Sequence, residues 1–212
     1  MSSRSEIERV RDLPLPNLRR WMLFVDGENL TARAQRVAKD AGVRLLEGRF
    51  YSRDTFVWIP YWLASSGMQV SRDNIPLQAS GVRAYYYASV VGDQQKIRSV
   101  QEALFEMQFT PKVFKKPKNR PSKAVDITLA TDMLGHAHRN DYDVAVLCAG
   151  DGDYVPLVEE VKRLGKGVRV AFFEGSGLSD ELRLASDTVL YLDDLFLRWW
   201  KQHLERSSEE QS

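Results

Sequence analysis

Residues 21–27 have the sequence WMLFVDG, in which five apolar residues stand together and an Asp-Gly pair ends the run. A short apolar run without alternation is typical of a strand buried on both faces, as the central strands of parallel sheets are. Leu30 begins a segment with helical spacing that continues to Ala41, and Gly42 is suited to ending it. The first unit is therefore predicted to be a buried strand followed by a helix.

The alternation of strand and helix continues along the chain. Segments rich in β-branched and aromatic residues predict strands, and segments with apolar residues at helical spacing predict helices. The further strands are expected at 82–89, 143–149, 168–173 and 188–192, and the further helices at 94–108, 122–139, 154–164 and 178–185. This order favours a three-layer α/β fold with a mostly parallel central sheet and helices on both faces.

The two ends of the chain and one internal stretch depart from this alternation. Residues 1–18 carry charges and two prolines and are predicted to be flexible, whereas residues 19–196 are predicted to form one domain. Residues 197–212 are expected to be a helix end and a polar tail that is loose from about Glu205. The stretch 50–80, which is rich in aromatic residues, is interpreted as an insertion into the domain.

The composition favours an intracellular protein and excludes some classes. Cys148 is the one cysteine, so no intramolecular disulfide can form, as is typical of a reducing compartment. No stretch approaches the roughly 20 apolar residues of a membrane span, and we therefore expect a cytoplasmic location. Lys and Arg number 30 against 29 Asp and Glu, a net charge of +1, so binding of nucleic acid would have to come from a local cluster.

Such a cluster stands between Pro111 and Lys123, which we interpret as a loop. Its basic residues are Lys112, Lys115, Lys116, Lys118, Arg120 and Lys123. They lead directly into the predicted helix that bears Asp126, and they are candidates for binding a nucleic-acid backbone. The alternative is an ordinary solvated loop.

Acidic residues follow two of the predicted strands. Asp26 ends the first strand, and Asp151 and Asp153 follow the strand at 143–149. The carboxyl ends of parallel strands share one edge of a sheet, where ligands bind. Buried carboxylates need hydrogen bonds or a cation, so an acid cluster at this edge predicts a metal site. Helix capping is the alternative for each acid taken alone.

A fourth acid, Asp126, stands near the start of the predicted helix 122–139. Apolar residues follow it at helical spacing, from Leu129 to Ala137, so Asp126 is predicted to lie on the buried stripe. The alternative is an acid in the first turn that complements the helix dipole. Asp132 falls off the apolar face and is expected to be solvated.

The four acids offer oxygen ligands without His or Cys at metal-binding spacing, which indicates Mg²⁺ or Mn²⁺ rather than zinc. Such ions serve phosphoryl chemistry, in which a metal-activated water attacks the phosphate and the metal stabilises the leaving oxygen. The sequence contains no P-loop, nucleophile elbow or zinc motif.

Three acidic motifs in this order resemble the NYN domain family of PIN-like ribonucleases. They are FVDGENL at 24–30, KAVD at 123–126 and AGDGDYVPL at 149–157, and the similarity continues into 165–168 and 182–187. The resemblance implies a metal-dependent endoribonuclease that cuts RNA. It implies that Asp26, Asp126, Asp151 and Asp153 bind the metal and that Asn29 is a polar residue of the site. The 50–80 insertion departs from the family pattern.

Two other functions fit the same residues. One is a non-catalytic RNA-binding or regulatory module that retains the fold, and the other is a small-molecule phosphatase, which would need a closed pocket. The aromatic insertion and the pair Trp199-Trp200 also suggest a contact in a homo-oligomer.

Overall fold

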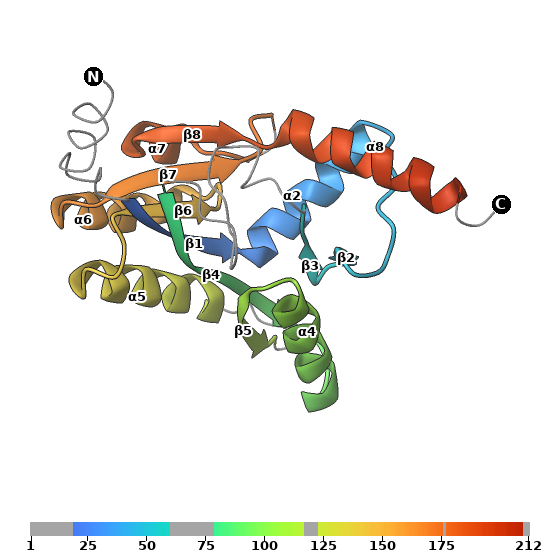
Figure 1. Cartoon of the computed structure of the whole chain (residues 1–212), viewed down its shortest axis with the longest axis horizontal. Coiled ribbons are helices and arrows are strands. Elements are labelled where there is room, and N and C mark those ends of the chain that lie inside the picture. Colours follow the sequence, from blue (N-terminus) through green and yellow to red (C-terminus); the bar gives the residue numbers. More distant parts are fainter. Residues whose placement is uncertain (1–18, 60–78, 117–122, 176, 210–212) are drawn as a thin grey trace, which may run out of the picture.

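The computed structural model describes residues 19–59, 79–116, 123–175 and 177–209, and its main feature is a six-stranded, all-parallel sheet (Figure 1). The order of the strands in the sheet is β5-β4-β1-β6-β7-β8. Their bounds are β1 Arg19–Asp26, β4 Ala79–Val90, β5 Thr110–Lys115, β6 Val144–Cys148, β7 Gly167–Phe172 and β8 Thr188–Tyr191. The predicted α/β class with a parallel sheet is confirmed.

Helices connect the strands and cover both faces of the sheet. They are α2 Gly27–Asp40, α4 Gln94–Glu106, α5 Ala124–His138, α6 Val155–Arg163, α7 Asp180–Ala185 and α8 Asp193–Glu209, and a 3-10 turn, η1 Gly152–Tyr154, precedes α6. The helix α8 is continuous to Glu209, beyond Glu205, where we expected a loose tail. No helix in the described part of the chain is long and apolar enough to cross a membrane.

The strand β1 is central because both of its neighbours are hydrogen-bonded to it along its length. It pairs with β4 on one side and with β6 on the other. Every side chain from Trp21 to Asp26 is buried, as the unbroken apolar run predicted. The carboxyl end of β1, which bears Asp26, therefore lies in the middle of one edge of the sheet.

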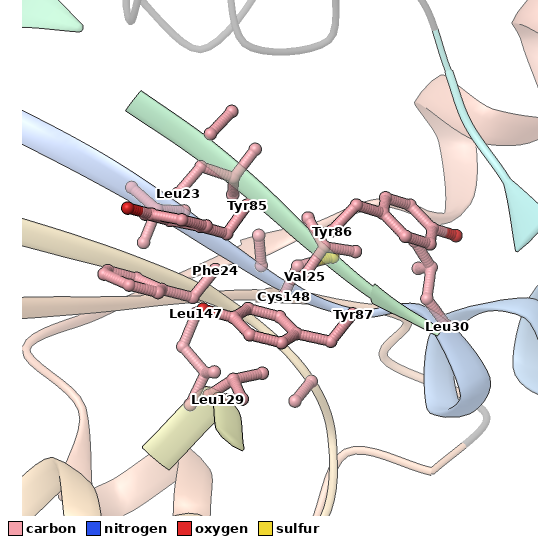
Figure 2. Close-up of a cluster of buried hydrophobic side chains, with 14 of the residues drawn as sticks. Leu23, Phe24, Val25, Leu30, Tyr85, Tyr86, Tyr87, Leu129, Leu147 and Cys148 are labelled. Carbon is pink, nitrogen blue, oxygen red and sulfur yellow. The ribbon is translucent and has the colours of Figure 1, made fainter. Parts of the chain in front are cut away.

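The three tyrosines of β4 show how the strand supports two helix layers (Figure 2). Tyr85 and Tyr87 lie on the face covered by α5, and Tyr85 stacks on Phe24 with 5.7 Å between the ring centroids. Tyr86 points to the opposite face, toward Leu30 of α2. Side chains of a strand alternate between its faces, so β4 packs against both layers.

The segment at 110–115 corrects one prediction. We expected a loop from Pro111, but Thr110–Lys115 is the edge strand β5, parallel to β4. A proline can stand in a strand only where its missing N–H is not required, and an edge strand offers that position. Lysines are also common on edge strands, where they oppose pairing with other chains. The features that suggested a loop are therefore those of a sheet edge.

Residues 50–59, the first described part of the 50–80 insertion, contribute several side chains to the core. Tyr51–Ser52 (β2) and Phe56–Val57 (β3) form a small antiparallel hairpin. Residues 56–59 are buried, and Trp58 packs edge-on against Phe109 with 4.6 Å between the ring centroids. Residues 60–78 lie outside the described residues.

The C-terminal tryptophans are also accounted for by packing within the chain. Trp200 is fully buried and contacts Tyr51 and Phe196. Trp199 is half-buried and packs against Phe50. Packing within the chain therefore accounts for Trp199 and Trp200. Residues 60–78 of the insertion lie outside the described residues, and the homo-oligomer stays a prediction.

Candidate active site

The carboxyl edge of the sheet brings together acids that are far apart in the sequence. Asp26 ends β1 between Tyr87 of β4 and the end of β6, and Asp151 follows β6 after a short connection. The first turn of α5 adds Asp126. The edge is therefore the candidate site that the sequence predicted.

Asp26 is the most buried of these acids, with 4% of its surface exposed. It is the N-cap of α2, and its Oδ1 accepts a hydrogen bond of 3.0 Å from the backbone N–H of Asn29. Burial raises the pKa of Asp26 to about 6, although the hydrogen bonds from Asn29 and Tyr154 act in the other direction. The negative charges of Asp126 and Glu28 raise this pKa further.

Asp126 does not lie on the buried stripe of α5, which corrects our prediction. Its side chain is exposed, and the buried positions begin with Val125, Leu129 and Met133. These residues are spaced by four, so the buried stripe begins one position before Asp126 and leaves the acid on its border. From this border Asp126 still reaches the edge of the sheet, where it meets Tyr154.

Tyr154 joins the two acids. Its buried hydroxyl lies 3.0 Å from Oδ2 of Asp26 and 3.3 Å from Oδ1 of Asp126. Burial and the two carboxylates keep the pKa of this phenol far above its ordinary value, so the phenol holds its proton. One hydroxyl has one proton to donate, so Tyr154 can donate to only one of the two carboxylates at a time.

The sequence analysis did not identify Tyr154. Its only local signal was its place directly after Asp153, at the start of an amphipathic helix, where a tyrosine is as easily a core residue.

Asp151 and Asp153 are exposed, and the side chain of Asp151 has a local role in the turn after β6. Asp151 is the N-cap of η1, and its Oδ1 accepts a hydrogen bond of 3.1 Å from the backbone N–H of Asp153. This is the capping role that we gave as the alternative. Within residues 19–59, 79–116, 123–175 and 177–209, no three His, Cys, Asp or Glu side chains stand close enough together to hold a metal ion.

None of the four acids forms an ion pair with a Lys, Arg or His among the described residues. Other aspartates do, such as Asp143 with Arg20 and Asp187 with Lys162. A buried carboxylate without a cationic neighbour is costly, and at Asp26 the cost appears as the raised pKa.

Asn29 ties the helix α2 to the end of β6. Its Oδ1 accepts a hydrogen bond of 3.2 Å from the backbone N–H of Gly150. Gly150 is required at this close approach, because a Cβ there would collide with the carbonyl oxygen of Gly177 and the ring of Phe172. Asn29 therefore holds the backbone that leads into Asp151.

The predicted basic cluster divides into two groups. Lys112 faces α5, where its Nζ lies 3.4 Å from Asp132 and 5.8 Å from the centroid of the Tyr85 ring. Asp132, which we expected to be solvated, also accepts a hydrogen bond of 3.0 Å from the hydroxyl of Tyr87. The contacts of Asp132 with Lys112 and Tyr87 stabilise the packing of α5 on the sheet.

The second group lies at the carboxyl edge. The Nζ of Lys116 lies 3.1 Å from Oε1 of Glu28, which also accepts a hydrogen bond from the hydroxyl of Ser89. Lys115 ends β5 and Lys123 precedes α5, and both are exposed. Lys118 and Arg120 lie outside the described residues. Glu28 lies within the motif FVDGENL, but the motif alone did not indicate a role for it.

A model of the NYN domain matches residues 20–193, which is most of the chain. The chain belongs to the NYN domain family. NYN domains are PIN-like ribonucleases, so at the level of the family the substrate is RNA. The acidic edge described above is thus the edge of an NYN domain, and the predicted resemblance is confirmed.

The fold is also seen in a solved structure. A protein of unknown function from Vibrio parahaemolyticus is similar with a TM-score of 0.57 and 20% sequence identity, over 87% of this chain and 99% of the other. At this identity the similarity shows the fold alone. No curated protein matches the chain.

Proposed function

We propose that this NYN domain is a metal-dependent endoribonuclease that hydrolyses phosphodiester bonds of RNA with Mg²⁺ or Mn²⁺ and water. The observation that supports it best is the convergence of Asp26 and Asp126, from different elements, on the hydroxyl of Tyr154. Neither carboxylate has a cationic partner in the described part of the chain.

The chemistry of the donor atoms, which are carboxylate oxygens, suits a hard cation. Asp26 and Asp126 provide two carboxylates, one of them buried with a raised pKa, so a cation that they held would offset the cost of burying the charge of Asp26. Asp151 and Asp153, which are exposed at the end of the neighbouring strand, are the carboxylates that would complete the set. When bound, Mg²⁺ or Mn²⁺ supplies an activated water and stabilises charge on the phosphate.

The residues of the chain have separate tasks in this proposal. Tyr154 positions the carboxylates of Asp26 and Asp126 relative to each other, and Asn29 fixes the backbone before Asp151. Asp126 is exposed, so RNA can approach the acids from solvent. Lys116, with Lys115 and Lys123, provides positive charge for the RNA backbone along the same edge, and Lys118 and Arg120 are candidates for the same task.

One observation favours the alternative, a non-catalytic RNA-binding module. Asp151 and Asp153 are directed to local capping and solvent, and no three acids are grouped within the described ranges. A domain that had lost catalysis would retain the fold and the basic edge without needing a convergent acid set.

A cleavage assay separates the two functions. Labelled single-stranded RNA and DNA are incubated with the protein in Mg²⁺, Mn²⁺ or EDTA, and the wild type is compared with Asp126→Asn and Asp151→Asn. Asp40→Asn, at the exposed end of α2, is the matched control. We expect metal-dependent cleavage of RNA that both site variants lose and the control retains. RNA binding without cleavage would establish the module instead.

A further inference from the structure

Arg33 stands on α2 one turn after Asn29 and is half-buried against the loop that follows β7. Its guanidinium and Cδ lie over Gly177, where a Cβ would collide with them. Gly177 has φ +106, a left-handed conformation that favours glycine. The absence of a side chain at Gly177 therefore leaves room for Arg33 next to the backbone at Gly150, which Asn29 holds.

The helix α2 places charged residues on two sides of Asp26. Residues four apart on a helix lie roughly 40° apart around its axis, whereas residues five apart lie roughly 140° apart. Arg33 therefore shares a side of α2 with Asn29, toward β6 and β7, and Glu28 faces away from it, toward β4 and β5. Since Glu28 pairs with Lys116, this lysine and Arg33 lie on opposite sides of Asp26.

Arg33 is free to bind an anion. Among residues 19–59, 79–116, 123–175 and 177–209, no carboxylate lies within ion-pair distance of its guanidinium. Arg36, three residues later on the same helix, is instead exposed and pairs with Asp40 at 3.8 Å. A guanidinium has a planar set of donors that matches phosphate oxygens.

We propose that Arg33 binds a backbone phosphate of single-stranded RNA. Lys116 lies on the other side of the acids. Together, Arg33 and Lys116 direct the RNA across the carboxyl edge of the sheet, from β5 to β7 and over Asp26. This inference rests on the proposed function, because RNA is taken as the ligand. It adds a binding residue that the basic cluster at 111–123 does not contain, on the far side of the acids.

The test measures binding apart from cleavage. Affinity for a fluorescent single-stranded RNA is determined in EDTA at several salt concentrations, for the wild type, Arg33→Gln, Arg33→Lys and the matched control Arg36→Gln. For single strands, each phosphate contact contributes about 0.7 to the slope of log affinity against log salt. We expect Arg33→Gln to lower the magnitude of this slope by about 0.7, and Arg33→Lys and Arg36→Gln to leave it near the wild-type value.

An equal slope for Arg33→Gln and Arg36→Gln would overturn the inference, and so would the absence of RNA binding by the wild type. Thermal unfolding of each variant separates a lost contact from a lost fold. If Arg33→Gln unfolds early, a crosslink from RNA to Arg33 in the wild-type protein decides the question: the crosslink supports the contact, and a crosslink to Arg36 without one to Arg33 overturns it. The proposed function is judged separately by cleavage in Mg²⁺ or Mn²⁺, so either can fail alone.

Discussion

The hydroxyl of Tyr154 lies 3.0 Å from Oδ2 of Asp26, although the two residues are 128 positions apart in the chain. This hydrogen bond joins the end of β1 to the turn that follows β6. It fixes the most buried acid of the site, and the same hydroxyl reaches Asp126. The Tyr154 hydroxyl therefore positions both Asp26 and Asp126 at the acidic edge.

Replacing Tyr154 by Phe should weaken the site more than the fold. The variant loses the hydroxyl that lies within hydrogen-bond distance of both carboxylates, and loss of such an orienting group typically lowers metal affinity or activity by about 10- to 100-fold. We expect weaker binding of Mn²⁺, measured by electron paramagnetic resonance, and slower RNA cleavage.

Tyr142→Phe is the matched control for this change. Its buried hydroxyl donates a hydrogen bond of 2.9 Å to the backbone carbonyl of Met133, away from the acids. Its loss should cost about 1 kcal/mol of stability and leave Mn²⁺ affinity unchanged. Equal Mn²⁺ affinity in the two variants would show that Tyr154 is only a core residue.

The raised pKa of Asp26 predicts how stability depends on pH in the metal-free protein. Between the ordinary pKa of 3.8 and the folded-state value of about 6, the folded protein holds a proton that the unfolded chain releases. The contribution of Asp26 is therefore fully present below pH 4 and is lost as the pH rises through 6. The loss amounts to at most about 3 kcal/mol.

Asp26→Asn isolates this contribution. Asparagine is also a good N-cap, so α2 keeps its start, whereas the titrating charge is gone. In EDTA, the free energy of unfolding of the wild type should fall relative to that of Asp26→Asn between pH 4 and pH 7, as measured by urea denaturation. Parallel curves over this range would contradict the burial of an uncompensated carboxylate.

Lys112, within β5, and Lys116, directly after β5, should differ in function. Lys112 lies on the α5 side of the sheet, beside Asp132 and Tyr85, so Lys112→Gln should cost about 0.5–1 kcal/mol and leave the salt dependence of RNA binding unchanged. Lys116→Gln should reduce the magnitude of the slope of log affinity against log salt by about 0.7, because this lysine lies at the acidic edge. The reverse pattern would place the RNA on the α5 face.

Gly27 tests the packing beneath the site. A Cβ at this position would collide with the ring of Tyr86 and the carbonyl oxygen of Tyr87, so Gly27→Ala should destabilise the fold by about 3 kcal/mol. Gly135→Ala, in the interior of α5, meets only the flexible end of Arg139 and should stabilise by about 0.5–1 kcal/mol. Thermal unfolding compares the two, and equal effects would contradict the close approach of α2 to β4.

Much of the fold followed from local patterns. The apolar run at 21–25 indicated a central strand, and the alternation of strands and helices indicated a parallel sheet with two helix layers. Because parallel strands share a carboxyl edge, the acids after β1 and β6 could be expected near each other. The strand β5 could not be recognised, because proline and lysine are typical both of loops and of sheet edges.

The sequence by itself determined the class of fold, the NYN family and the acids at the sheet edge, since periodicity, turn residues and motifs are local. Only the tertiary structure decided the orientation of each side chain. It joined Tyr154 to Asp26 and Asp126, turned Lys112 toward α5, buried the residues at 56–59 and set Arg33 against Gly177. Such contacts depend on how distant elements pack, and spacing along one element carries no information about its neighbours.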